Sequence, residues 1–543
     1  MRIGRGCLVS LVVLVLVAAT GGVLLRWALD PDALRRSAET RLSRALGQPV
    51  SIGDMDLDVW PTPSLQGQSV TIGKGAAAAA PGLTLAGLRI VPRLSSIFSR
   101  PIVVERLELE ELVVRVLRNK DGKWILPLPG AASASGGTSD QVAVDIERAV
   151  LKDGSLVLID ETVSGKLELA RHTDAPDRAR QAGSEPPGIR DIQATMTLAA
   201  GEARLERLTG RVGESTITGT GAAGRDGLRV SLEWQSLRAS DLPVVFALLG
   251  TEATAGLAIE GDKPLTLQLA VDPTGTLNGE GRLAASKAVF GTLTVTSLAS
   301  PLRVGTNRVS LDPLTFTLYG GQHRGVFTAD TSAAPVTWTM RSSLDGVDVN
   351  ALLSANTAAK NKLSGSGRVR AALRGTTAAP IERGVTGTIA LDVAKGTVHE
   401  FPLLAAINGT LGLGTSGDDR DLRFDTLSAT LAVANAAMTT DDLTATSGDL
   451  AIRAAGSLRF DLALDMTGVA RFAREKSDEL VRRQKHLGGL RNPQGELEIP
   501  FSVAGTAAAP TFSIDMEKVM KRAAGKELKR QLNRRLKDLI KFR

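Results

Sequence analysis

The four histidines are the side chains of this sequence best suited to bind a metal or to transfer protons at neutral pH. They are scattered along the chain, and their spacing does not resemble that of a metal-ligand set. One of them follows a Gly-Gly pair, and we interpret it as a polar surface residue in a turn. The four are His172, His323, His399 and His486, and His323 is the one in the turn.

Two further patterns suggest ligand binding at first sight. Residues 210–224 are rich in glycine, but they lack the Gly-Lys-Ser/Thr end of a phosphate-binding loop, and their alternation indicates a strand and a turn. The acidic pairs Asp418-Asp419 and Asp441-Asp442 fall where turns are expected. Calcium binding there is one interpretation, and we favour the commoner one, which is a solvated turn.

Catalytic constellations are missing from the sequence. No Gly-x-Ser-x-Gly motif is present, and no pair of carboxylates is placed for acid–base chemistry. The single cysteine, Cys7, lies in an apolar segment, so neither an intrachain disulfide nor a thiolate metal site is expected. We therefore expect no enzymatic activity, no cofactor, and no catalytic or metal-binding residues.

Alternation of apolar and polar residues dominates from residue 50 to about residue 513 and predicts β-strands with one apolar face. The clearest run is Leu458, Phe460, Leu462, Leu464 and Met466, which we propose as a lipid-binding strand face. Similar runs occupy residues 107–109, 314–318 and 389–393, and turn signals lie at 120–122, 152–154, 225–227 and 319–321.

Few helices are expected to cover the apolar face of these strands. The candidates are residues 241–249, 349–355 and 471–488. One large sheet could curl around its apolar face and leave a groove open to acyl chains. A row of separate sandwiches with filled cores explains the composition equally well. The predicted fold is mainly β: an elongated, curled, antiparallel sheet with a taco-like groove and few short helices.

The first residues predict a membrane anchor. Residues 7–25 are uncharged and about long enough to span a bilayer, with Arg2 and Arg5 before them. We favour an anchor with a cytoplasmic N-terminus over a cleaved signal peptide, because no clear cleavage site follows. A short helix over residues 30–47 comes next. Asp30 suits the cap of this helix and Pro31 its first position. One apolar face is formed by Leu34, Ala38, Leu42 and Leu46.

The last residues predict a basic amphipathic helix over 514–543, which holds the whole net charge of +7. Three roles remain open: a cap on the sheet edge, contact with an anionic membrane surface, and binding to a protein partner. Because the excess charge sits in one tail, we do not expect a nucleic-acid-binding protein. The membrane-surface candidates are Leu528, Lys529, Arg530, Leu532 and Leu536.

The expected order of parts follows from these segments. Residues 1–6 are the cytoplasmic N-terminus, 7–25 the anchor, 30–47 the short helix, 48–173 an N-terminal β region, 174–188 a flexible loop, 189–513 a C-terminal β region and 514–543 the basic helix. Residues 75–82 and 130–140 also have the composition of flexible loops.

Several short motifs, in their order, give the chain a resemblance to the AsmA family. They include GQPVSI at 47–52, WPTP at 60–63, LYGG at 318–321 with Gly325, LSGSG at 363–367 and IPF at 499–501. The turn at 121–124 is similar to a DGxxNW-like turn of the family, with Lys123 in place of its asparagine. Residues 174–188 fit the resemblance least.

This resemblance implies a protein of the bacterial inner membrane, crossing it once, with most of the chain in the periplasm. It further implies that phospholipid binds in an apolar β-groove and that the protein supports outer-membrane biogenesis and integrity. The alternative is a non-enzymatic assembly factor that acts on outer-membrane proteins through protein partners. An outer-membrane barrel is excluded, because aromatic residues make up only 3% of the chain.

Overall fold

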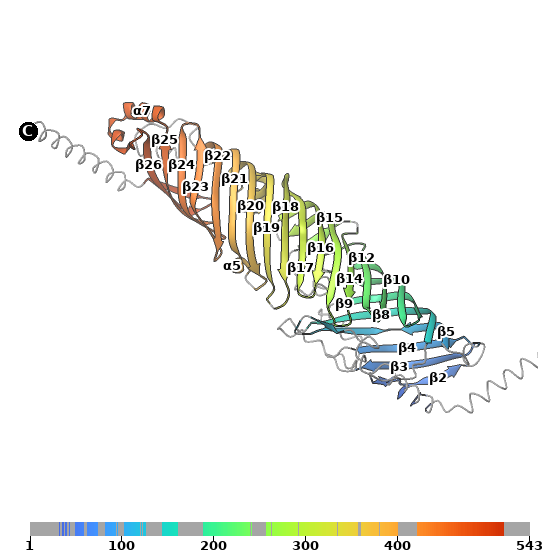
Figure 1. Ribbon diagram of the computed structural model, residues 1–543. Coiled ribbons are helices and arrows are strands. Elements are labelled where there is room, and N and C mark those ends of the chain that lie inside the picture. Colours follow the sequence, from blue (N-terminus) through green and yellow to red (C-terminus); the bar gives the residue numbers. More distant parts are fainter. Residues whose placement is uncertain are drawn as a thin grey trace, which may run out of the picture. The chain divides into compact units, whose positions relative to one another are not determined.

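The computed structural model describes, with short gaps, residues 32–73, 82–125, 144–160, 188–241, 257–399 and 421–514. The strands of these segments belong to one large β-sheet, which confirms the predicted mainly-β class (Figure 1). Contacts between residues divide the chain into two compact units. The first comprises residues 1–285, 301–310 and 330–336, and the second comprises 286–300, 311–329 and 337–543.

The first unit is built mainly from strands β1 to β15. Hydrogen bonds join β3 to β4, β4 to β5, β8 to β9, and then β9 through β12 in sequence order to β14 and β15. The strands are β1 (Val50–Ser51), β2 (Met55–Asp58), β3 (Ser64–Gly73), β4 (Gly82–Pro92), β5 (Ile102–Glu110), β6 (Val113–Arg118), β7 (Trp124–Ile125), β8 (Val144–Asp160), β9 (Gly188–Ala199), β10 (Glu202–Val212), β11 (Ser215–Gly224), β12 (Gly227–Trp234), β13 (Leu257–Glu260), β14 (Leu265–Val271) and β15 (Leu277–Phe290).

The sheet of the first unit is not wholly antiparallel, which corrects the sequence prediction. Strand β8 runs parallel to β5 over its first half and parallel to β6 over its second half. The predicted turn at 152–154 lies inside β8, where Asp153 has φ 55°. The ladder between β8 and β9 shifts register between Leu151 and Gly154, so β8 has one extra residue there and forms a bulge. Glu111, between β5 and β6, also has a positive φ of 50°. The Asp-Gly pair therefore forms this bulge instead of ending the strand.

The predicted helix after the anchor is helical at each of its described positions, which are 32, 35, 36, 39, 40 and 43. Its polar residues bond to the first strand: Glu39 Oε1 accepts from the Ile52 amide at 2.8 Å, and Ser43 Oγ accepts from the Val50 amide at 2.8 Å. Arg35 donates to the Ile52 carbonyl at 3.3 Å. Because these three residues are spaced by four, one helical face holds the chain against β1. The four apolar positions predicted to form a face lie outside the described residues.

Strands β16 to β27 lie mainly in the second unit. Two short stretches among them, residues 301–310 and 330–336, belong to the first unit. From β19 to β27 every strand pairs antiparallel with the next. The strands are β16 (Leu293–Gly305), β17 (Arg308–Leu318), β18 (Gly321–Asp330), β19 (Thr337–Asp348), β20 (Leu363–Thr376), β21 (Thr386–Val398), β22 (Leu422–Ala434), β23 (Ala437–Ser447), β24 (Leu450–Arg459), β25 (Ala463–Phe472), β26 (Leu497–Thr506) and β27 (Pro510–Ile514).

Tight turns explain how these strands follow one another. Tyr319 and Gly320 have φ 43° and 80°, and Asn435 and Ala436 have φ 51° and 57°. Two consecutive residues with positive φ form the turn type whose twist matches that of paired strands. The predicted turn at 319–321 is thus confirmed, and residues 314–318 and 389–393 lie in strands β17 and β21 as predicted.

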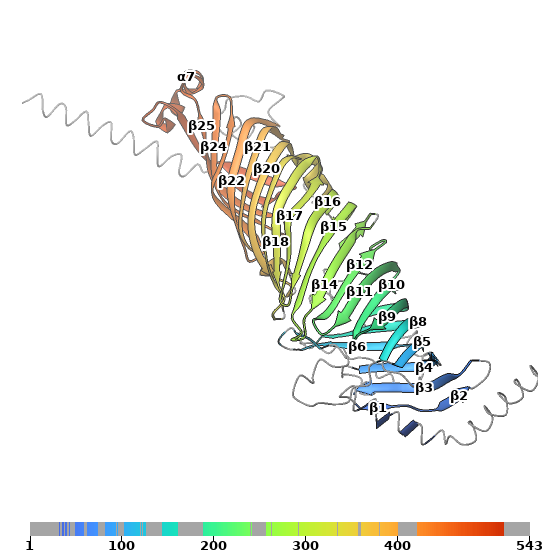
Figure 2. The ribbon, with the colours of Figure 1, turned by 45° about the vertical axis from the view of Figure 1, so that its right-hand side comes forward.

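The second unit's strands bend along their length, as Figure 2 shows for β20 to β25. Three neighbouring strands each contain a residue with positive φ: Gly346 in β19, Gly365 in β20 and Lys395 in β21. The ladders around Gly346 and Gly365 shift register at these residues. Such bulges bend a strand and increase its twist, so they supply the curvature.

The described helices are short. They are α4 (Val349–Asn356), α5 (Ile381–Gly384), α7 (Arg474–Arg483) and the 3-10 helix η4 (Lys485–Leu490). Helix α4 confirms the prediction for 349–355. The prediction for 471–488 is confirmed by α7 and η4 except at its start, because residues 471 and 472 belong to β25. Of the predicted segment 241–249, only Asp241 is described.

Several predicted segments lie outside the described residues. They are the anchor at 7–25, nearly all of the loops at 75–82, 130–140 and 174–188, and the basic helix after its first residue, at 515–543, with its membrane-surface candidates. Ile514, the first residue of the predicted helix, instead ends strand β27. Among the helices that the structure describes, none has the length and apolarity to cross a bilayer. Gly188 belongs to β9, whose ladder with β8 joins the regions before and after 174–188 within the first unit.

Candidate functional site

One face of strands β9 to β15 in the first unit is a surface without charge. The register aligns residues from neighbouring strands into rows, and residues in one row point to one face. The first row is Ala194, Leu208, Gly219, Leu232, Leu267 and Gly281, and the second is Met196, Leu205, Gly221, Val230, Leu269 and Gly279.

Two glycines lie among the larger apolar residues in each of these rows. Leu267 is 1% exposed and Leu232 is 7% exposed, whereas Leu205, Val230 and Leu269 remain half-buried. At Gly281 a Cβ atom would lie 2.2 Å from the Thr266 carbonyl oxygen, so glycine permits the close approach of the strands there. This face therefore offers apolar surface that is only partly covered by the protein itself.

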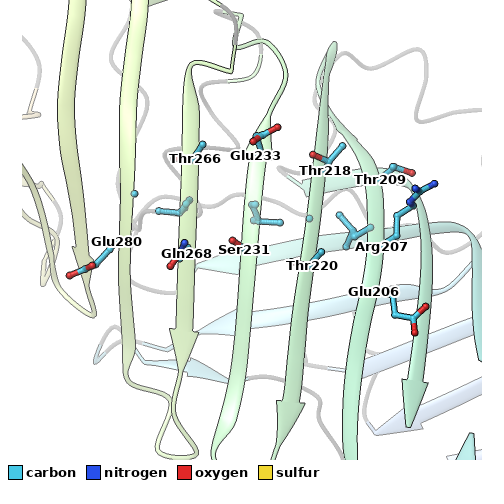
Figure 3. A pocket seen from close by; sticks show the side chains of 15 residues that line it. Glu206, Arg207, Thr209, Thr218, Thr220, Ser231, Glu233, Thr266, Gln268 and Glu280 are labelled. Atoms are coloured by element: carbon cyan, nitrogen blue, oxygen red, sulfur yellow. The ribbon is translucent and has the colours of Figure 1, made fainter.

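Two hollows of about 870 and 890 Å³ lie over β10 to β15, and Figure 3 shows the first of them. Each is lined by one apolar row and by the polar rows on both sides of it, which include Thr220, Ser231, Gln268 and Glu280. The neighbouring apolar rows do not line them. Because polar and apolar rows point to opposite faces, we assign the hollows to the polar face of the sheet. They are not openings of the apolar face.

The second unit has a corresponding uncharged face over β19 to β26. Its ion pairs lie on the other side: Arg368 pairs with Asp345, and Arg370 with Asp392 at 3.1 Å. Three rows carry the apolar face: Leu344, Val369, Leu391 and Ala429; Ser342, Ala371, Ile389 and Leu431; and Met340, Leu373, Gly387, Val433, Met438, Leu458 and Leu464.

Helix α7 and η4 cover the far end of this face. Leu480, Leu487 and Leu490 pack in one cluster with buried residues of β24, β25 and β26. Ser477 lies beneath the helix, where its hydroxyl donates to the Phe472 carbonyl and accepts from the Leu497 amide at 2.8 Å. The apolar face of the second unit is thus filled at this end, while Val369, Leu373, Ile389 and Leu391 are only half-buried.

The lipid-binding run predicted from sequence is a hairpin and not one strand. Strand β24 ends at Arg459 and β25 begins at Ala463, so Phe460 and Leu462 belong to the turn. Phe460 is 39% exposed, and Leu462 has φ 68°. Leu458 pairs with Leu464 across the ladder, and Met466 follows on the same face. Three of the five predicted residues therefore share a face.

His323 is buried within the apolar face, which corrects its interpretation as a surface residue. It lies in β18 and is 6% exposed. Its ring stacks on Phe316 at a centroid distance of 3.8 Å, and Nε2 lies 2.7 Å from Ser342 Oγ. Burial lowers the pKa of His323 below its usual value near 6.5, and the Leu314 carbonyl partly offsets this.

This burial predicts a pH-dependent stability. Below pH 6.5 the unfolded chain binds a proton at His323 that the folded protein does not, so stability falls from there down to the folded pKa and then levels off. We expect the thermal midpoint of the wild type to drop between pH 7.5 and 5.5 by more than that of His323→Phe. Differential scanning fluorimetry of both proteins measures this. Equal pH profiles would contradict the prediction.

The remaining candidates form no site among the described residues. His399 Nδ1 lies 2.9 Å from Asp421 at the surface, and no cluster of described side chains suits a metal ion.

Residues 210–224 form the end of β10 and all of β11, as predicted. Asp441 and Asp442 lie in β23 and not in a turn. Backbone and hydroxyl donors of Thr430 and Thr440 lower the pKa of Asp442. His172, the side chain of His486, and Asp418-Asp419 are not described.

Each unit by itself has the same character: a mainly-β sheet whose uncharged face is only partly covered. Comparison with known families gives a match to the AsmA family over residues 263–443. Within this region the match confirms the resemblance to the family that the sequence motifs indicated. No curated protein and no solved structure matches the chain. The family match suggests a role in lipid transport or assembly in the cell envelope.

Proposed function

We propose that this protein binds phospholipid on the apolar face of its sheet and conducts it within the bacterial cell envelope. In this proposal residues 7–25 anchor the chain in the inner membrane, most of the chain lies in the periplasm, and the activity is not enzymatic. It supports the biogenesis and integrity of the outer membrane. The uncharged rows of β9 to β15 are the observation that carries the proposal.

Physical chemistry favours acyl chains as the ligand of these rows. Apolar surface gains about 25 cal/mol per Å² when it leaves water, and the half-buried residues Leu205, Val230 and Leu269 still expose such surface. Two rows run side by side across six strands, about 24 Å at the usual strand spacing. That length is comparable to an extended acyl chain. A soluble polar ligand would leave its hydrogen bonds unmade here.

A charge placed on the apolar face tests the proposal. The full-length protein is purified in mild detergent and loaded with phospholipid. We expect Leu269→Asp to retain at most about one tenth of the lipid that the wild type retains. The matched control is Gln268→Asp, one residue away on the exposed polar face. Native mass spectrometry and lipid extraction quantify the lipid, and circular dichroism confirms that both variants keep their strands.

The outcomes separate three interpretations. Loss in Leu269→Asp alone supports the apolar face as the lipid site. Loss in Gln268→Asp alone would move the site to the polar hollow that this residue lines. A wild-type protein that carries no lipid would contradict the proposal and favour the assembly-factor alternative.

A further inference from the structure

His323 of β18 is an ionisable side chain that lies on the apolar face of the second unit, stacked on Phe316 of β17. In β19, Ser342 points to the same side as Met340 and Leu344, because alternate residues of a strand share a face. Its hydroxyl therefore lies on the apolar side together with the imidazole of His323. A surface for acyl chains alone has no use for such a pair.

The surroundings of the pair are built around the imidazole ring. Phe316 stacks on it with an interplanar angle of 4°. Gly325 lies beneath it, and a Cβ atom there would come 2.9 Å from Cε1 and 3.1 Å from Nε2. Any larger residue at position 325 would displace the ring. The position of His323 is thus fixed by an aromatic residue on one strand and a glycine on its own strand.

Apolar residues of β20 and β21 flank Ser342 on the side away from His323. The register places Ala371 opposite Ser342 and Ile389 opposite Ala371. Ser342 is half-buried, whereas His323 is almost fully buried. A hydroxyl group has one donor and two acceptor sites, and the bond to Nε2 uses only one of them. With the ring proton on Nε2, His323 donates to Ser342 Oγ, and the hydroxyl proton of Ser342 stays available to donate on the apolar face.

We propose that Ser342, positioned by His323, is the point on the second unit's apolar face that binds an oxygen atom of a phospholipid. This inference rests on the proposed function and adds to it a place where the polar part of the lipid meets the sheet. The oxygen belongs either to an acyl ester or to the phosphate, and both accept hydrogen bonds. The apolar rows on both sides of Ser342 then contact the acyl chains.

The test compares three variants of the full-length protein in mild detergent, loaded with a diacyl phospholipid or with its diether analogue. We expect Ser342→Ala and His323→Phe to retain about three- to tenfold less diacyl lipid than the wild type, as the loss of one hydrogen bond predicts. The control is Ser343→Ala, whose hydroxyl bonds to Asp345 at 3.0 Å on the opposite face. It should retain lipid as the wild type does.

The diether lipid, which lacks ester carbonyls, identifies the oxygen. If Ser342→Ala no longer differs from the wild type with this lipid, the ester carbonyl is the partner. If the difference persists, the phosphate is. A thermal midpoint measured for each variant controls for folding, and Ser342→Ala, the smaller change, decides the question if His323→Phe does not fold.

Two failures remain distinguishable. If the wild type binds lipid and Ser342→Ala binds it equally well, the pair merely ties β18 to β19, and this inference is overturned while the proposed function stands. If the wild type binds no lipid, both fall together.

Discussion

Replacing Arg118 with methionine is expected to lower the free energy of unfolding of the first unit by about 3 kcal/mol. Arg118 ends strand β6 and is 1% exposed. Its guanidinium donates to the Thr306 carbonyl at 3.0 Å and to the Thr331 carbonyl at 3.3 Å. Methionine fills a similar volume but donates no hydrogen bond, so the buried Thr331 carbonyl and the part-buried Thr306 carbonyl both lose this donor.

The effect should be local as well as large. Arg118 connects β6 with residues 306 and 331, which are distant in sequence and belong to the same unit. Amide hydrogen exchange at β6 and around these residues should therefore accelerate. The control is Arg148→Met, an exposed position in β8, where a change within about 0.5 kcal/mol is expected. Equal exchange in both variants would show that the bonds of Arg118 contribute little.

Alternation was a reliable guide wherever one face of a strand is free of charge. Residues 314–318 and 389–393 lie in strands for this reason, with their apolar residues on the face that the rows define. Alternation wrongly predicted one strand over residues 458–466, because it continues through the hairpin turn between β24 and β25. That turn contains no Gly, Pro or Asn. Asp461, whose carboxylate accepts from the Ala463 amide at 3.1 Å, was the one local sign of it.

The face on which a side chain lies depends on register, and single strands do not specify register across the sheet. His323 illustrates this limit. The spacing of Gly321, His323, Gly325 and Phe327 places all four on one face, and this was the available signal for its burial. The preceding Gly-Gly turn suggested a surface position instead. The parallel pairing of β8 with β5 and β6 was likewise invisible, since it joins segments that are separated by other strands.

The helical period at 471–488 predicted α7 and η4, but it carried no information on what they cover. Their position over β24 to β26 results from a cluster that unites Leu480, Leu487 and Leu490 with strand residues on both sides of them in the sequence. Such a cluster forms only after the strands pair. The candidate site shares this property, because each of its rows draws one residue from each of several strands.

Truncating Leu487 to alanine is expected to destabilise the second unit by about 2–5 kcal/mol. Leu487 is 1% exposed and packs in the cluster with Ile499 and Phe501, so alanine would leave a cavity beneath η4. The matched control is Val481→Ala, a half-buried residue at the edge of the same cluster, where a smaller loss is expected.

Hydrogen exchange resolves the effect of Leu487→Ala along the chain. The amides of β26 and η4 should exchange faster than in Val481→Ala, whereas those of β3 and β4 in the first unit should not change. Chemical unfolding followed at the second unit gives the free energy. If Leu487→Ala and Val481→Ala destabilise the unit equally, the cover formed by α7 and η4 does not depend on close packing at Leu487. The burial of this leucine in a cluster with strand residues argues that it does.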